Sequence, residues 1–403
     1  MYDAIVVGAR CAGSPTAMLL ARTGYKVLLV DKAGFPSDTL STHYIHQPGV
    51  ARLKRWGLLD KVAASNCPPI RYQTFDVGPF ALRGSPPPVD GVADGYAPRR
   101  TILDKILVEA AATAGAEVRE HFSVSELVTD GERVAGIRGH AAGGAMVTEE
   151  ARIVIGADGL HSMVARAVNA PLYNERPVQA CAYYSYWGGV EIEGPNLNPR
   201  PDRMIMAAPT NDGQTLVIIF WPVAAFHEVR SDVEVNFLKA LDLAPGLAER
   251  VRAGRRSERF RGTADLRNQF RRPYGPGWAL VGDAGYHKDP ITAQGISDAF
   301  RDSELLAEAI DDGFARRRPI EQALAAYEQA RNEAVQSIYE FTVQFASLAP
   351  PAPEMQHLFA ALRHDQEQTN RFFGTIAGTV PIPEFFSPEN LERIVGGALA
   401  TAG

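Results

Sequence analysis

Two glycines and an acid near the start of the chain have types and a spacing that suit a charged ligand. Gly8 and Gly13 lie in a turn between an apolar strand and a helix. The backbone N–H groups at such a helix start face outward and can bind a pyrophosphate. Asp31 follows the next apolar strand about 20 residues later, where an acid binds a ribose hydroxyl. We therefore predict a dinucleotide site formed by these three residues, with the adjacent Lys32 included.

The middle position of this turn is Arg10, where such turns normally carry a glycine that lets the backbone approach the pyrophosphate. An arginine in an ordinary right-handed conformation fits the turn, and its guanidinium could pair with the phosphates. This pairing is a hypothesis. An Arg10→Ala variant with unchanged dinucleotide affinity would contradict it.

Two further acids follow short apolar strands later in the chain. Asp158, with Gly159 after it, comes behind the strand 151–155, and the pair Gly282-Asp283 ends the strand that begins at 280. Dinucleotides lie outside the carboxyl ends of parallel strands, so both acids are expected at the same edge, where Asp283 could bind a polyol hydroxyl. A helix expected from about Ala293 would direct its positive end at this crevice.

Hydrophobic spacing indicates the elements that position these motifs. We expect helices at 15–22, 48–56, 101–114, 231–247, 293–310 and 320–345. Between 178 and 226 the chain is instead rich in aromatic and β-branched residues, which predicts an antiparallel sheet.

The predicted fold class is α/β, with a Rossmann-type nucleotide-binding domain, an inserted β-rich substrate domain and a helical C-terminal tail. The nucleotide domain is expected to be discontinuous, at 1–75, 96–175 and 265–345. The substrate domain takes 76–95 and 176–264, and the tail takes 346–403.

The composition limits the partners. The 403 residues carry a net charge of −6, which disfavours nucleic acid. No apolar run reaches the length of a membrane span, and the start lacks the features of a signal peptide, so we expect a cytoplasmic protein. The 3 cysteines have no paired spacing, which indicates neither a disulfide framework nor a metal site.

In motif order and spacing, residues 1 to about 345 resemble FAD-dependent monooxygenases of the aromatic hydroxylase type, a family that grades into flavin halogenases and geranylgeranyl reductases. The resemblance implies that the first turn and Asp31 bind the adenosine and pyrophosphate of FAD, and that Asp283 binds its ribityl chain. It also implies that Asp158 and Gly159 serve both FAD and a nicotinamide donor. The same resemblance places Arg100 and a backbone group near Val124 along the cofactor. It places Pro290 and the backbone of Gln294 and Gly295 against the isoalloxazine ring.

The implied reaction is a monooxygenation. NADH or NADPH reduces FAD, and O2 then supplies an oxygen atom to an aromatic or polycyclic small molecule. A phenol becomes a better nucleophile when its proton is removed, so a base or a hydrogen-bond relay is expected. The candidates are His43, His46, His287, Tyr184 and Tyr186.

The two tyrosines share one face of a predicted strand, and Tyr183 and Trp187 share the other; one of these faces should look at the flavin. Each histidine could equally be a hydrogen-bonded structural residue, and the tyrosine strand could be ordinary core.

Alternative functions stay open at this level. They are a reductase that saturates isoprenoid double bonds, an oxygenase served by a separate reductase, and a flavin-binding protein without turnover. The Trp-x-Trp-x-Ile-Pro signature of tryptophan-type halogenases is missing, and Phe220-Trp221-Pro222 is only an echo of it. No redox cysteine pair lies near the first turn, which argues against disulfide reductases. The chain could act as a monomer or a homodimer.

Overall fold

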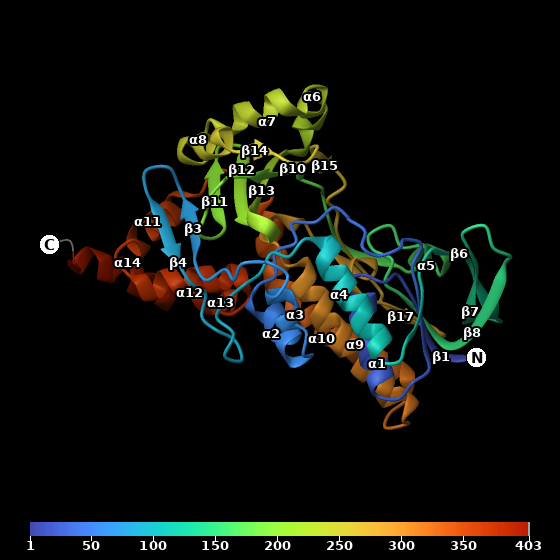
Figure 1. Ribbon diagram of the computed structural model, residues 1–403. Coiled ribbons are helices and arrows are strands. Elements are labelled where there is room, and N and C mark those ends of the chain that lie inside the picture. Colours follow the sequence, from blue (N-terminus) through green and yellow to red (C-terminus); the bar gives the residue numbers. More distant parts are fainter. Residues whose placement is uncertain (402–403) are drawn as a thin grey trace.

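The strands that carry the glycine and acid motifs lie side by side in one sheet of the computed structural model, which describes residues 1–401 (Figure 1). The sheet has the order β17-β18-β8-β1-β2-β5, and the five strands from β18 to β5 pair in parallel. Strands buried on both faces read as continuous apolar runs, as β1 and β2 do. The sheet consists of β1 (Tyr2–Val7), β2 (Val27–Val30), β5 (Glu117–Arg119), β6 (Phe122–Asp130), β7 (Arg133–Ala141), β8 (Val147–Gly156), β17 (Tyr274–Gly275) and β18 (Trp278–Leu280).

Helices pack their apolar sides against this sheet. Ala17, Leu103 and Phe300 belong to one buried cluster with Val6 and Leu29 of the strands. The helices that contribute to this layer are α1 (Gly13–Arg22), α2 (Gln47–Arg55), α3 (Leu59–Ala63), α4 (Arg100–Thr113), α9 (Gly295–Phe314) and α10 (Ile320–Phe345). The short α5 (Met163–Ala167) lies on the other side, in a cluster with Phe122 of β6.

A second sheet has the order β14-β10-β13-β12-β11-β3-β4, with β15 also paired to β10. Its strands are β3 (Gln73–Asp76), β4 (Ala81–Gly84), β10 (Ala180–Gly188), β11 (Asn196–Arg200), β12 (Arg203–Pro209), β13 (Gln214–Pro222), β14 (Arg255–Arg256) and β15 (Arg261–Thr263). A third, small sheet joins β9 (Leu172–Arg176), β16 (Asn268–Arg271) and β19 (Tyr286–His287). Short 3-10 turns complete the chain at η1 (Asn211–Gly213), η2 (Val223–Ala225), η3 (Gly282–Ala284) and η4 (Pro290–Thr292).

Both faces of the second sheet are covered, each by a different set of helices. Tyr183 and Trp187 pack with Phe237 under α6 (Phe226–Ser231), α7 (Val233–Leu241) and α8 (Pro245–Ala253). Tyr184 and Tyr186 belong to the opposite cluster, which includes the C-terminal helices α11 (Pro353–Leu362), α12 (Gln366–Ala377), α13 (Ile382–Phe385) and α14 (Pro388–Thr401). Figure 1 shows the C-terminal helices in red on the side away from the N-terminus. The predicted alternation of this strand is confirmed.

The fold class is confirmed: a Rossmann-type domain, a β-rich sheet and a helical C-terminal region are all present. The exact domain boundaries stay a prediction, although β3 joins the second sheet from Gln73 onward. Of the predicted tail, residues 402 and 403 lie outside the described part of the chain. Within the described part, no helix combines the length and apolarity that crossing a membrane requires.

One predicted helix is wrong. The stretch 231–247 forms parts of three helices, because Asp232 leaves helical geometry and its side chain accepts a hydrogen bond from Val235 N–H, and Pro245 begins α8. The helix predicted from Ala293 begins two residues later, since Ala293 adopts a left-handed conformation with φ 53°.

Candidate functional site

The parallel register brings the separate motifs to one edge. Val7 pairs with Val30 and with Gly156, and Gly156 pairs with Leu280, so the residues that follow these strands lie together. A cavity of about 780 Å³ opens at this edge. The predicted residues that line it are Gly8, Arg10, Asp31, Lys32, Arg100, Val124, Asp158, Gly159, Tyr184, Gly282, Asp283, His287, Pro290 and Gly295.

The first turn is tight, and its two glycines are required by space. A Cβ on Gly8 would lie 2.4 Å from the Ala157 carbonyl oxygen, and Gly8 has φ +104°. A Cβ on Gly13 would lie 1.7 Å from the Gly8 carbonyl oxygen. Gly13 therefore lets α1 start against the strand end and does not itself line the cavity. Arg10 is not among the residues with positive φ, so the turn accepts a side chain there.

Asp31 is fixed by the backbone of the turns on either side. Its Oδ2 accepts a hydrogen bond from Ala9 N–H at 2.7 Å, and its Oδ1 accepts one from Ala33 N–H at 2.8 Å. Each carboxylate oxygen has a further lone pair. Because the residue also lines the cavity, those lone pairs are available to a ligand hydroxyl.

A buried carboxylate, Asp104, holds both arginines of the site. Its oxygens accept hydrogen bonds from Arg100 at 3.0 and 3.1 Å, and from Arg10 at 2.5 Å. Arg10 also donates to the Ser37 hydroxyl at 2.9 Å. One negative charge thus faces two positive ones, which leaves an excess positive charge on this wall of the cavity.

The start of α9 faces the cavity with free N–H groups. No side chain caps this helix, and a Cβ on Gly295 would meet nothing within 4 Å. The Gln294 side chain turns away, and its amide donates to the Ile376 carbonyl of α12. Uncapped N–H groups at the positive end of a 20-residue helix favour a negatively charged ligand.

A four-residue ion cluster lies behind this helix start. Lys288 and Arg301 both donate to Asp298, and Arg301 also donates to Asp302. Burial raises the pKa of Asp298, but Lys288 and Arg301 outweigh that effect and hold the pKa below its usual value. Lys288, Asp298 and Asp302 line the cavity.

A smaller apolar pocket of about 40 Å³ adjoins the large cavity and shares Thr42, Tyr44, Ile218 and Ala293 with it. His46 lines this pocket and is buried. Its Nε2 lies 3.1 Å from the Thr292 carbonyl oxygen, which can only accept, so Nε2 carries the proton. Its Nδ1 is then a buried lone pair, and it has no partner among the described residues.

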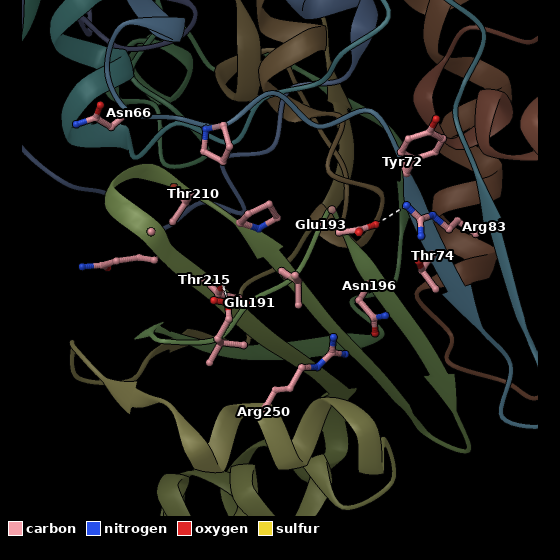
Figure 2. A pocket seen from close by; sticks show the side chains of 17 residues that line it. Asn66, Tyr72, Thr74, Arg83, Glu191, Glu193, Asn196, Thr210, Thr215 and Arg250 are labelled. Carbon is pink, nitrogen blue, oxygen red and sulfur yellow. Dashed lines mark hydrogen bonds and ion pairs between the residues drawn. The ribbon is translucent and has the colours of Figure 1, made fainter.

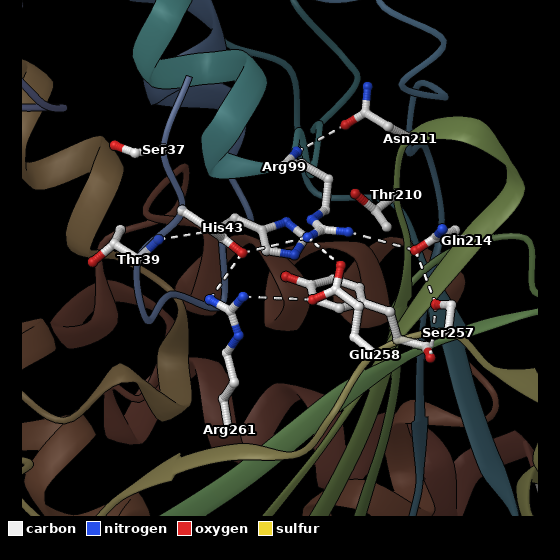
Figure 3. Close-up of polar contacts among 12 residues, drawn as sticks. Ser37, Thr39, His43, Arg99, Thr210, Asn211, Gln214, Ser257, Glu258 and Arg261 are labelled. Atoms are coloured by element: carbon white, nitrogen blue, oxygen red, sulfur yellow. Dashed lines mark hydrogen bonds and ion pairs between the residues drawn. The ribbon is translucent and has the colours of Figure 1, made fainter. Parts of the chain in front are cut away.

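His43 and Tyr186, in contrast, do not line either cavity. They lie in a polar cluster between the loop 32–46 and the second sheet, where the His43 ring stacks on Tyr186 at 5.7 Å and the Arg99 guanidinium covers Tyr186 at 3.8 Å. Figure 3 shows Arg99, Glu258 and Arg261 converging beside His43. Arg99 pairs with Glu258 at 2.6 Å, and Arg261 pairs with Asp38 at 3.0 Å.

The other two candidates occupy the large cavity at different places. Tyr184 is buried in its wall, its hydroxyl has no partner among the residues that the structure describes, and burial raises its pKa. His287 lies nearer the surface and its Nδ1 contacts the Arg267 carbonyl oxygen.

A third hollow, of about 750 Å³, lies against the second sheet between the segments around Glu191 and Thr210 (Figure 2). Its rim carries an exposed ion pair of Arg83 with Glu193. None of the predicted site residues lines it.

Several residues at the site were not predicted from the sequence. Asp104, Lys288 and Asp298 hold the charged groups in place, and Tyr44, Gln73 and Ile376 line the apolar pocket. Only Asp104 carried a local signal, since it lies four residues after Arg100 on the same helix face.

The geometry fits FAD. One cavity is lined by a turn with outward N–H groups, an acid at the second strand end, an acid on η3 and a helix start without a side-chain cap among the described residues. Open space in place of a Cβ at Gly159 and Gly295 leaves room for a ligand against the backbone. These features define a dinucleotide-binding protein of the Rossmann type.

The chain belongs to the FAD binding domain family, which matches residues 1–342. It is 27% identical over 369 residues to digeranylgeranylglycerophospholipid reductase 1 of Methanopyrus kandleri, covering 87% of this chain and 91% of that protein. The family predicted from the sequence is therefore confirmed, and with it an FAD-dependent oxidoreductase.

Two solved structures illustrate the shared fold. The myxobacterial chondrochloren halogenase CndH has a TM-score of 0.80 at 23% identity, covering 99% of this chain and 97% of that one. PqsL of P. aeruginosa in complex with 2-aminobenzoylacetate has a TM-score of 0.73 at 20% identity, covering 86% of this chain and 96% of that one. At these identities the likeness concerns the fold alone.

Proposed function

We propose that this protein is a monooxygenase that uses FAD, NADH or NADPH, and O2 to hydroxylate a phenol-type aromatic molecule. FAD, when bound, supplies the redox chemistry with oxygen. The protein's part is to hold the ring beside the cofactor, exclude water and accept a hydrogen bond from the phenol's hydroxyl group.

The observation that carries this proposal is that His46 lines an apolar pocket beside the FAD cavity and that its buried Nδ1 has no partner among the described residues. A buried lone pair without a partner costs free energy, which a ligand O–H would recover by donating to it. Burial lowers the pKa of His46 to about 4. The ring is therefore neutral near pH 7 and able to accept a hydrogen bond from a phenol.

The remaining site residues have roles consistent with this proposal. The first turn, Arg10, Asp31, Lys32, Arg100 and Val124 would hold the adenosine and pyrophosphate end of FAD, and Asp158, Gly159, Gly282, Asp283, Pro290, Gln294 and Gly295 the flavin end. Tyr184 would form part of the substrate wall. His43, Tyr186 and His287 are the weaker catalytic candidates, because the first two lie outside both cavities and the third lies near the surface.

A second candidate is saturation of an isoprenoid double bond. The similarity to the Methanopyrus kandleri reductase favours it, and so do the aliphatic walls of the pocket. An isoprenoid chain has no O–H group for His46, however, which is why hydroxylation ranks first.

Anaerobic reduction of the FAD-loaded protein tests the proposal. NADH and NADPH are mixed with the protein, with and without a panel of phenols, and flavin absorbance is followed. Bleaching that a phenol accelerates is the expected result. Failure of both donors to bleach a correctly bound flavin would contradict a self-sufficient monooxygenase.

A further inference from the structure

The apolar pocket beside the FAD cavity is too small for a ring as it stands. Its volume is about 40 Å³, whereas an apolar cavity that takes up benzene measures about 150 Å³. A ring can therefore enter only by displacing one of the wall side chains or by extending into the adjoining large cavity. The identity of that side chain decides which ligands fit.

Most of the wall is fixed by its backbone. Met206 and Ile218 lie on paired strands β12 and β13, opposite each other in the ladder. Ile291 lies in η4, where the Asp289 side chain accepts a hydrogen bond from its N–H at 3.0 Å. The backbones that carry these residues are therefore fixed by sheet pairing and by the loop that lines the FAD cavity.

Ile376 differs from the rest of the described wall because it alone comes from the C-terminal helices. It lies at the end of α12, two residues before the left-handed Gly378, and beyond the part of the chain that matches the FAD binding domain family. Its side chain is buried, and its carbonyl accepts from the Gln294 amide beside the α9 start. The backbone is thus anchored to the FAD cavity while the side chain closes the pocket.

We propose that Ile376 is the specificity-determining residue of this pocket and that it limits the ligand to a single ring bearing a hydroxyl group. The size limit comes from the Ile376 side chain. The hydroxyl preference comes from polar residues of the pocket wall: His46, whose Nδ1 has no partner among the described residues, and Gln73, whose amide donates to the Tyr44 hydroxyl at 3.3 Å. That such a ligand is also the substrate rests on the proposed function.

Binding by calorimetry to the FAD-loaded protein, without a nicotinamide donor, tests this inference. The ligands are phenol and the two-ring 2-naphthol. The variants are Ile376→Ala, which enlarges the pocket, and Ile376→Phe, which fills it. Ile394→Ala is the matched control, since Ile394 is buried in the same apolar cluster but does not line the pocket.

The measured quantity is the ratio of the affinity for 2-naphthol to the affinity for phenol. In Ile376→Ala this ratio is expected to be at least ten times that of the unchanged protein. Ile376→Phe is expected to weaken phenol binding at least tenfold, and Ile394→Ala to leave the ratio unchanged. An unchanged ratio in a folded, FAD-containing Ile376→Ala protein would overturn the inference. If that variant does not fold, Ile376→Val must shift the ratio in the same direction by a smaller factor, and no shift would overturn it.

This test separates the two proposals. It measures binding without turnover, so a protein that binds phenol as described but forms no hydroxylated product would contradict the proposed function and leave the role of Ile376 intact.

Discussion

At His46, one ring nitrogen is committed to the backbone and the other is left free. The same is true of His43, whose Nδ1 lies 3.0 Å from the Ala97 carbonyl oxygen while its Nε2 has no partner in the described chain. The difference between them is location, because only His46 lines a cavity next to the FAD site. The sequence does not distinguish these two histidines, but only the one that lines the pocket can contact a ligand there.

Replacing His46 tests its role as the hydrogen-bond acceptor for the phenol hydroxyl. His46→Phe is expected to lower the rate of phenol hydroxylation about fivefold, since a neutral hydrogen bond contributes about 1 kcal/mol. Binding of toluene, which has no hydroxyl, should change little. The control is His357→Phe on the exposed side of α11, and an equal loss of toluene binding would show that the variant damages the pocket instead.

Arg10 tests the electrostatics of the first turn. Arg10→Ala is expected to weaken FAD binding at least tenfold, since a charge-assisted hydrogen bond contributes about 1.5 to 3 kcal/mol. In the structure its guanidinium is held by Asp104 and Ser37, so the loss combines a missing phosphate partner with a looser 32–46 loop. Fluorescence titration of the apoprotein with FAD measures the affinity. An unchanged affinity would contradict the pairing of Arg10 with the phosphates.

At the scale of elements, the start of α9 is held by the Lys288 and Asp298 pair. Both side chains are almost fully buried, with exposures of 3% and 8%. Breaking a buried pair by removing one partner leaves an uncompensated charge and costs about 3 to 5 kcal/mol. An exposed pair contributes only about 0.2 to 1 kcal/mol.

Because Arg301 still pairs with Asp298, Lys288→Met is expected to lower the free energy of unfolding by about 2 kcal/mol, the contribution of one hydrogen bond to a charged group. Lys105→Met is the matched control, because Lys105 pairs with Glu109 on the surface at 3.8 Å with both side chains about half exposed. Urea unfolding of the two variants and of the unchanged protein measures these free energies. Equal losses in both would contradict the assignment of the buried pair.

Features that are encoded within a short stretch of sequence were predicted, whereas features that depend on contacts between distant residues were not. The β1-α1-β2 opening follows from Gly8, Gly13 and an apolar run within about 30 residues, so its geometry was accessible. The segment 76–95 was predicted to belong to the substrate domain, but the pairing that joins β3 and β4 to the second sheet was not. It connects Leu197 with Phe75 across more than a hundred residues and carries no local pattern. The placement of Tyr184 in a cavity and of Tyr186 under Arg99 depends on such long-range contacts. For the same reason Ile376 could not be found from the sequence.

At the scale of the whole molecule, buried titratable groups set the response to pH. Burial and Arg99 lower the pKa of His43 to about 3, and burial lowers that of His46 to about 4. Below about pH 6.5 the unfolded chain binds these protons and the folded protein does not. Each histidine therefore lowers the free energy of unfolding by about 1.4 kcal/mol for every unit by which the pH is lowered, until the pKa of the folded protein is reached.

Asp289 acts in the opposite direction. Burial raises its pKa to about 7, so between about pH 4 and 7 the folded protein holds a proton that the unfolded chain releases, and stability rises as pH falls. Asp289→Asn should therefore steepen the loss of stability by about 1.4 kcal/mol per pH unit between pH 4.5 and 6. Unfolding free energies from urea titrations across this range would show it, and identical slopes in the two proteins would contradict it.

The most direct measurement is oxygen incorporation from labelled O2. The FAD-loaded protein is supplied with NADH or NADPH and a monocyclic phenol under 18O2, and the product is analysed by mass spectrometry. A hydroxylated product carrying one labelled oxygen atom is the expected result. A product that has gained hydrogen without oxygen, or NAD(P)H consumption that yields only reduced oxygen, would contradict hydroxylation as the function.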